Sequence, residues 1–168
     1  MESVESSNIR TIDEQKIVFI RNIYFKGKRS IDWNQVEIYL RQYVGSIYRV
    51  AETEEDIIIG TDLPGEYTGS IYTKKLKGAA AKAKAHATQV LPEMLKIATN
   101  REFEKNRKEK HNRDAKNGWY RYETGFAVPI YNMEGELIRY NIYQAKILVR
   151  HASDGRKYLY DILEIKKK

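Results

Sequence analysis

The last third of the chain carries the pattern that most restricts the fold. Three runs rich in β-branched and aromatic residues follow one another between residues 119 and 165, a composition typical of strands. Turn signals separate the runs: Asn132-Met133-Glu134-Gly135 comes first, and the dipeptide Asp154-Gly155 is typical of a tight hairpin. The pattern predicts contiguous antiparallel strands over residues 119–165.

The second turn also predicts which side chains share a face. With Asp154-Gly155 at its centre, His151 pairs with Tyr158. Neighbouring residues of a strand point to opposite faces, so Arg150 and His151 can serve one face only where a bulge intervenes. Both faces mix apolar and polar residues, which favours one of them as a binding surface.

Helical patterns precede these strands. Residues 33–44 repeat apolar side chains at spacings of three and four, and Asp32 stands where an N-cap belongs. Residues 74–99 are helical in composition and carry a stripe of small side chains. Pro92 suits the first turn of a second segment better than a helix interior, so we expect a break near Gln89.

The other segments complete an α+β arrangement, with helices followed by an antiparallel sheet. Residues 1–29 are predicted to be a lead-in segment with one strand-like run, and residues 30–168 to be a single domain. The remaining predictions are a hairpin over residues 48–59, a loop over residues 61–70, and an exposed helix end with a loop over residues 100–117.

Composition excludes several classes of protein. The chain of 168 residues has no Cys, which excludes disulfide scaffolds, thiolate zinc sites and Cys nucleophiles. Its three His residues lack the spacing of a zinc helix, and no glycine-rich nucleotide motif is present. We therefore expect neither a metal nor a cofactor. No apolar run approaches the ~18 residues that would span a bilayer, and the acidic N-terminus is unlike a signal peptide.

Basic charge is concentrated in the middle of the chain. The whole chain has 30 Lys and Arg against 23 Asp and Glu, a net charge of +7, and residues 71–116 alone carry 13 basic and 5 acidic side chains. A basic stretch of this size favours a polyanionic partner, most simply nucleic acid. The alternative is a solvated helical face with extra lysines.

Three segments resemble motifs of known nuclease-like domains. They are residues 66–73 (EYTGSIYT), residues 110–122 (KHNRDAKNGWYRY) and residues 150–162 (RHASDGRKYLYDI). Similar motifs occur in domains of bacteria and their mobile elements, within phage head-morphogenesis proteins of the MuF type and large polyvalent proteins. The resemblance covers residues 30–168 and implies the barnase–EndoU–colicin–RelE superfamily. Its members are metal-independent ribonucleases with N-terminal helices packed on a four-stranded antiparallel sheet.

Metal-free cleavage of RNA needs a base for the 2′-hydroxyl, an acid for the leaving oxygen and cations for the phosphorane. His supplies either proton role near neutral pH. His111 lies in a basic loop directly before a strand, whereas Arg150 and His151 end a later strand. We predict that His111 and one of Arg150 or His151 converge on a groove between the basic helix and the sheet, with Tyr160 near its floor. The alternative for each residue is an ordinary loop or strand position.

A second set of side chains is predicted to bind nucleic acid. Its cations would position phosphates, and its hydroxyls would bind phosphate oxygens, although turn chemistry also accounts for the hydroxyls. The set comprises Lys75, Lys82, Lys84, Lys110, Arg113, Thr68 and Tyr72.

Together these features predict an endoribonuclease-like toxin domain that cleaves RNA, with tRNA as one possible target, by general acid–base catalysis. We expect RNA as the substrate, an immunity or antitoxin protein as a further partner, and no membrane partner. The expected location is the cytoplasm. The alternative to this location is that the domain is delivered into a target cell as part of a larger protein. The alternative is a non-catalytic nucleic-acid-binding or structural module of a phage or conjugative element.

Overall fold

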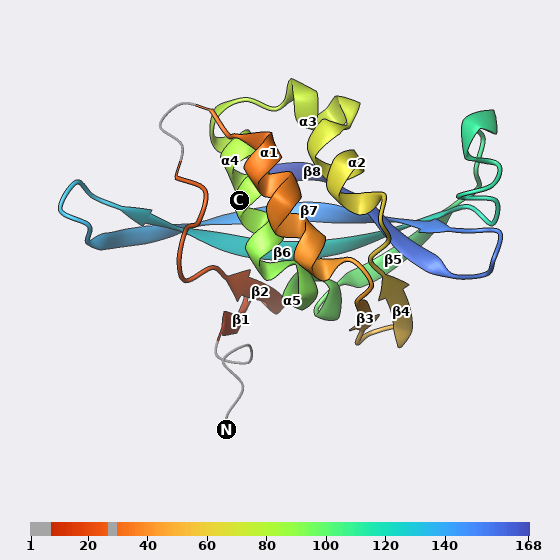
Figure 1. The fold of residues 1–168 in the computed structure, drawn as a ribbon. Helices are drawn as coiled ribbons and strands as arrows, with labels where there is room; N and C mark the ends of the chain where they lie inside the picture. The colour runs from red at the N-terminus through yellow and green to blue at the C-terminus, as the bar shows by residue number, and fades with distance from the viewer. Residues whose placement is uncertain (1–7, 27–29) are drawn as a thin grey trace.

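Most of the architecture is one curled sheet. The structure, a computed structural model, describes residues 8–26 and 30–168. The strands in this part of the chain are β1 (Ile9–Ile12), β2 (Gln15–Phe19), β3 (Ile47–Val50), β4 (Glu55–Ile58), β5 (Thr99–Glu104), β6 (Trp119–Tyr131), β7 (Leu137–His151) and β8 (Lys157–Lys167). They form an eight-stranded sheet in the order β1-β2-β6-β7-β8-β4-β3, and β5 also pairs with β6 (Figure 1).

The predicted fold class is wrong. It placed N-terminal helices on a C-terminal, antiparallel, four-stranded sheet, but strands from both halves of the chain build a mixed sheet. β2 runs parallel to β6, with Val18 opposite Phe126, and β4 runs parallel to β8, with Ile57 opposite Lys157. The lead-in predicted over residues 1–29 thus supplies β1 and β2, while residues 1–7 and 27–29 lie outside the described residues.

The antiparallel pairing predicted for residues 119–165 is confirmed, because β6, β7 and β8 pair in that order. The predicted register at the second turn is wrong by one residue: His151 pairs with Lys157, not with Tyr158. The loop between them is longer than a two-residue turn, and Gly155 at its end has φ +85°. A loop of this kind commonly ends in a left-handed glycine.

A bulge in β8 compensates for this shift. Val149 pairs with Leu159, but Leu148 pairs with Asp161, so Tyr160 is the extra residue. A bulge re-aims the side chains next to it and increases the local twist. Tyr160 and Asp161 therefore leave the strict alternation of the strand at the place where both have important contacts.

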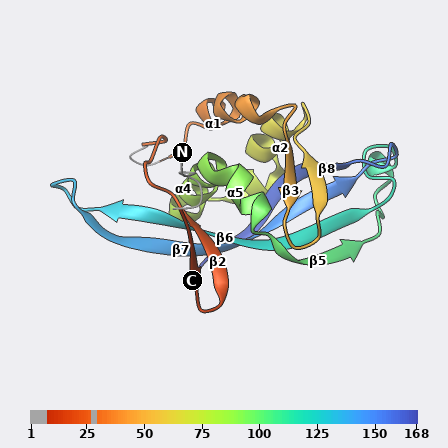
Figure 2. The same cartoon turned by 90° about the horizontal axis from the view of Figure 1, so that it is seen from below.

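The helices lie together over one face of the sheet (Figure 2). They are α1 (Trp33–Leu40), α2 (Leu63–Gly69), α3 (Ile71–Lys75), α4 (Gly78–Ala87) and α5 (Leu91–Lys96). Asp32 caps α1 as predicted, since its side chain accepts a hydrogen bond from the Asn34 backbone N–H at 3.0 Å. The predicted break near Pro92 is also confirmed: a 3₁₀ turn over Thr88–Val90 separates α4 from α5.

Two predicted loops contain regular structure. Residues 61–70 hold α2, because Pro64 occupies the first turn of a helix, where its missing N–H costs nothing. Residues 100–117 begin with a strand, β5, which pairs with β6. Its many charged side chains are unlike a typical strand, so the sequence pattern did not predict it. The hairpin predicted over residues 48–59 is confirmed by the antiparallel pair β3–β4.

The main core lies between the helices and the sheet. Ile147 and Val149 of β7 are fully buried in it, together with Met94 of α5. Side chains alternate along a strand, so Leu148 and Arg150 point to the opposite face. That face has only a small buried cluster of its own among the described residues, built around Ile17, Phe19 and Ala127 near β2.

We expect Gly118→Ala to destabilise the protein by about 2–4 kcal/mol, because two costs combine. Gly118 has φ +101°, and a Cβ there would lie 2.6 Å from Phe103 and 2.8 Å from the Glu104 carbonyl oxygen. Gly135 is a matched control, since it has φ +82° but nothing within 4 Å. Urea denaturation should show a cost of about 1–2 kcal/mol for Gly135→Ala. Equal costs for the two variants would show that the contact with Phe103 does not matter.

Candidate active site

The loop between β5 and β6, residues 105–118, lies at one end of the three long strands (Figure 1). It leads into β6, whose first residues include Trp119 and Arg121. These two side chains share a face of the sheet with their partners in β7, Arg150 and Leu148. These side chains lie opposite the helical core. The groove predicted between the basic helix and the sheet is therefore not where His111 lies: α4 covers the other face.

His111 forms a close pair with Asp114 in this loop. Its Nδ1 lies 3.0 Å from each carboxylate oxygen of Asp114, within a short turn that brings residues three apart together. A carboxylate only accepts, so Nδ1–H donates and Nε2 is left as the acceptor of the neutral ring. Nε2 has no hydrogen-bond partner in the described part of the chain. In this arrangement Nε2 is the ring atom that can accept a proton.

Two aromatic side chains hold the His111 ring. Trp119 and Tyr160 each meet it edge-to-face, with centroid distances of 5.1 and 5.7 Å, and they meet each other at 5.0 Å. Only 12% of the His111 side chain is exposed. Burial and the nearby Glu66 carboxylate raise the pKa of Tyr160 well above its ordinary value. Like any phenol at neutral pH, the Tyr160 hydroxyl is a hydrogen-bond donor.

Arg150 braces the loop instead of offering a free cation. Its Nη1 donates to the Asp114 carbonyl oxygen at 2.9 Å, and its Nε lies 3.2 Å from Asp62. The guanidinium also stacks over Tyr158, 4.2 Å from the ring centroid. Arg150 and His111 thus both contact Asp114, Arg150 at its carbonyl oxygen and His111 at its carboxylate, and Arg150 acts there as a positioning residue.

His151 does not join this site. Its ring contacts Tyr120 at 5.7 Å, and its Nε2 lies 3.2 Å from the Gly155 carbonyl oxygen. Tyr120 packs against the helical core, so His151 lies on the face opposite His111. Of the four predicted catalytic residues, His111, Tyr160 and Arg150 are brought together and His151 is not.

A cavity of about 370 Å³ opens beside His111. Aromatic and aliphatic side chains form an apolar part of its lining, and cationic side chains of the loop and of β6 form another part together with Glu104. The lining includes Arg107, Lys108, Trp119, Arg121, Leu148 and Tyr160. Sequence reasoning missed Asp114, Arg107, Lys108 and Arg121 as site residues, although three-residue spacing from His111 was a signal for Asp114.

The predicted phosphate-binding lysines are divided between two surfaces. Lys110 and Arg113 are exposed on the loop near His111. Lys75 is exposed at the end of α3 and Lys82 is half-buried on α4, so both belong to the helical layer, away from the loop (Figure 1).

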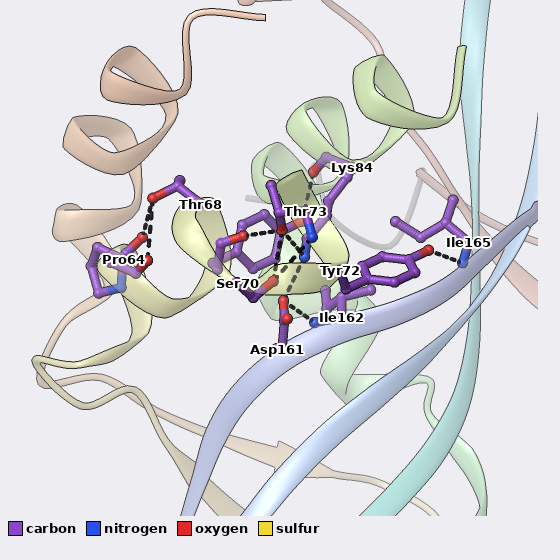
Figure 3. Close-up of polar contacts among 11 residues, drawn as sticks. Pro64, Thr68, Ser70, Tyr72, Thr73, Lys84, Asp161, Ile162 and Ile165 are labelled. Carbon is purple, nitrogen blue, oxygen red and sulfur yellow. Dashed lines mark hydrogen bonds and ion pairs between the residues drawn. The ribbon is translucent and has the colours of Figure 1, made fainter. Parts of the chain in front are cut away.

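Lys84 cannot contact a phosphate at the surface, which corrects its prediction. Its side chain is fully buried, and its Nζ lies 2.6 Å from Asp161 Oδ1 and 2.6 Å from Thr73 Oγ1 (Figure 3). The Ala-rich sequence around Lys84 is typical of a solvated face, but the carboxylate that neutralises this lysine belongs to β8.

The fold already uses the two predicted phosphate-binding hydroxyls. Thr68 donates to the Pro64 carbonyl oxygen at 2.8 Å inside α2. The Tyr72 hydroxyl accepts from the Ile165 backbone N–H at 2.8 Å, on the edge of β8 (Figure 3). Neither hydroxyl lines the cavity at His111.

No family model, no curated protein and no solved structure matches the chain. Among residues 8–26 and 30–168, no helix is long and apolar enough to cross a membrane, and no group of three or more His, Asp or Glu side chains is placed to hold a metal ion.

Proposed function

We propose that this protein is a metal-independent endoribonuclease of the kind its motifs resemble, with His111 as the general base. The observation that carries the proposal is the His111–Asp114 pair, at 3.0 Å, beside a cavity rimmed by Arg107, Lys108 and Arg121. A carboxylate partner fixes the ring, although the Asp114 side chain is itself 37% exposed, and the cations match a phosphodiester.

The reaction follows from these groups. Nε2 of His111 takes the proton of a ribose 2′-hydroxyl, and the 2′ oxygen forms a bond to the adjacent phosphorus. The bond from phosphorus to the 5′ oxygen breaks, and that oxygen takes a proton from solvent water. The products are a 2′,3′-cyclic phosphate and a 5′-hydroxyl. The loop cations neutralise the charge that grows on the phosphorane.

The test is to incubate the purified chain with an end-labelled RNA in the presence of EDTA. We expect cleavage to persist, with cyclic phosphate ends, because the proposed proton transfers use His111 and solvent water and need no metal ion. An RNA in which every 2′-hydroxyl is replaced by hydrogen is the matched control and should stay intact. Cleavage of that control, or cleavage lost in EDTA, would contradict the proposal.

RNA affinity should fall with salt, and the β5–β6 loop should account for the slope. For single strands, each neutralised phosphate contributes about 0.7 to the slope of log affinity against log salt. Replacing Lys110 and Arg113 by Gln should therefore lower the slope by about 1.4, as measured by fluorescence anisotropy. The charge-matched control replaces Lys75 and Lys82 by Gln and should leave the slope unchanged. An equal decrease in both variants would place RNA on the helical layer as well.

One observation favours a second candidate, a nucleic-acid-binding module without catalysis. The Arg150 guanidinium is already in contact with Asp62, Asp114 and Tyr158. His151 lies on the other face of the sheet, so the predicted catalytic set is incomplete. RNA binding with the salt dependence above, but without cleavage, would select this alternative. An antitoxin or immunity partner belongs only with the first candidate.

A further inference from the structure

The cavity beside His111 has two unlike surfaces. Trp119, Tyr160 and Leu148 present rings and an aliphatic side chain, whereas the loop brings Arg107 and Lys108 to the rim. Its volume of about 370 Å³ is within the range of pockets that hold small ligands. A surface that binds only a phosphate backbone needs the cations but not the apolar floor.

A nucleotide has the same two parts as this cavity. Bases stack on aromatic side chains, and phosphates lie against Lys and Arg. In duplex RNA the bases stack on one another and only a shallow groove is accessible, so aromatic stacking selects unpaired nucleotides. The match between the cavity and the ligand is therefore a match to single-stranded nucleic acid.

We infer that the cavity binds the base of one unpaired nucleotide against Trp119 and Tyr160, so that the protein acts on single-stranded RNA. This inference rests on the proposed function, because it names the substrate of the same site. The geometry links binding to chemistry: the His111 ring contacts both Trp119 and Tyr160. A nucleotide whose base contacts these rings has its ribose next to His111, the proposed general base.

The chain offers a direct spectroscopic test because it has only two Trp residues. A Trp33→Phe variant leaves Trp119 as the reporter, and a Trp119→Phe variant leaves Trp33, which packs against the helical core. The probes are a 12-nucleotide 2′-deoxy strand, which cannot be cleaved, and the same strand in a blunt duplex. We expect the single strand to quench Trp119 but not Trp33, and the duplex to bind at least tenfold more weakly.

A second variant measures the stacking itself. Tyr160→Ala should weaken single-strand binding by about 5- to 150-fold, the effect of removing one base–aromatic stack. Circular dichroism of this variant checks that it folds. Equal affinity for single strand and duplex, or binding without quenching of Trp119, would overturn the inference. RNA cleavage in EDTA separates the two hypotheses: if it persists in those cases, only the nucleotide pocket fails.

Discussion

Asp161→Asn is expected to lower the free energy of unfolding by about 3–5 kcal/mol, because it leaves a buried charge without its partner. Lys84 is fully buried and Asp161 nearly so, and their 2.6 Å contact joins α4 to β8 (Figure 3). Burial lowers the pKa of Lys84, and the Asp161 carboxylate opposes that shift. Asn at position 161 can still accept from the Ile162 N–H, so the variant removes the charge and little else.

A double-mutant cycle is the control for this prediction. Lys84→Met combined with Asp161→Asn removes both charges, and the double variant should recover most of the stability lost in Asp161→Asn alone. Arg49→Met is the exposed comparison: the Arg49–Asp56 pair is solvated on both sides, so its loss should cost less than about 1 kcal/mol. Urea denaturation measures the wild type, Lys84→Met, Asp161→Asn, their double variant and Arg49→Met. A cost below that of Arg49→Met for Asp161→Asn would show that the buried pair is not a stabilising contact.

The second large effect concerns catalysis. His111→Ala should slow RNA cleavage by about 10²–10⁴-fold, which is the usual contribution of a general acid or base. His151→Ala is the matched control: it also removes an imidazole, but from the opposite face of the sheet, and should leave the rate unchanged. Single-turnover cleavage with saturating enzyme measures both variants, because it separates the chemical step from RNA binding.

A third variant tests what Asp114 does. Asp114→Asn can still contact Nδ1, but its amide no longer requires Nδ1 to be the donor, so the rate should fall while RNA affinity changes little. If His111→Ala and His151→Ala slow cleavage equally, or if neither does, His111 is not the base. In the second case the protein binds RNA without cutting it at this site.

Local signals predicted those parts of the fold that depend on neighbouring residues. Asp32 capped α1, Pro92 marked a break, and Asp154-Gly155 turned the chain between two strands. The parallel pairings of β2 with β6 and of β4 with β8 left no such signal, because a strand of four or five residues has the same pattern beside any partner. The number of strands in the sheet was wrong for this reason.

The site shows the same division. His111 could be singled out because it lies in a basic loop directly before a strand and because His can serve as a general acid or base near neutral pH. The pairing of Arg150 with Tyr158 and the position of Tyr160 depend on a loop one residue longer than predicted and on the bulge that compensates for it. Lys84 could not be recognised as buried, since Asp161 lies 77 residues away in the sequence.

The two parallel pairings also affect the order in which the protein can assemble. β2 and β4 join strands that are synthesised about a hundred residues after them, and contacts between such distant segments slow folding. While the chain leaves the ribosome, the apolar side chains of the β1–β2 and β3–β4 hairpins stay exposed until β6 and β8 have been made. Exposed strand edges promote aggregation during that interval. We therefore expect newly made chains to need protection until β8 has emerged, because that strand joins the β3–β4 hairpin to the sheet and delivers the only carboxylate paired with Lys84 in the described part of the chain.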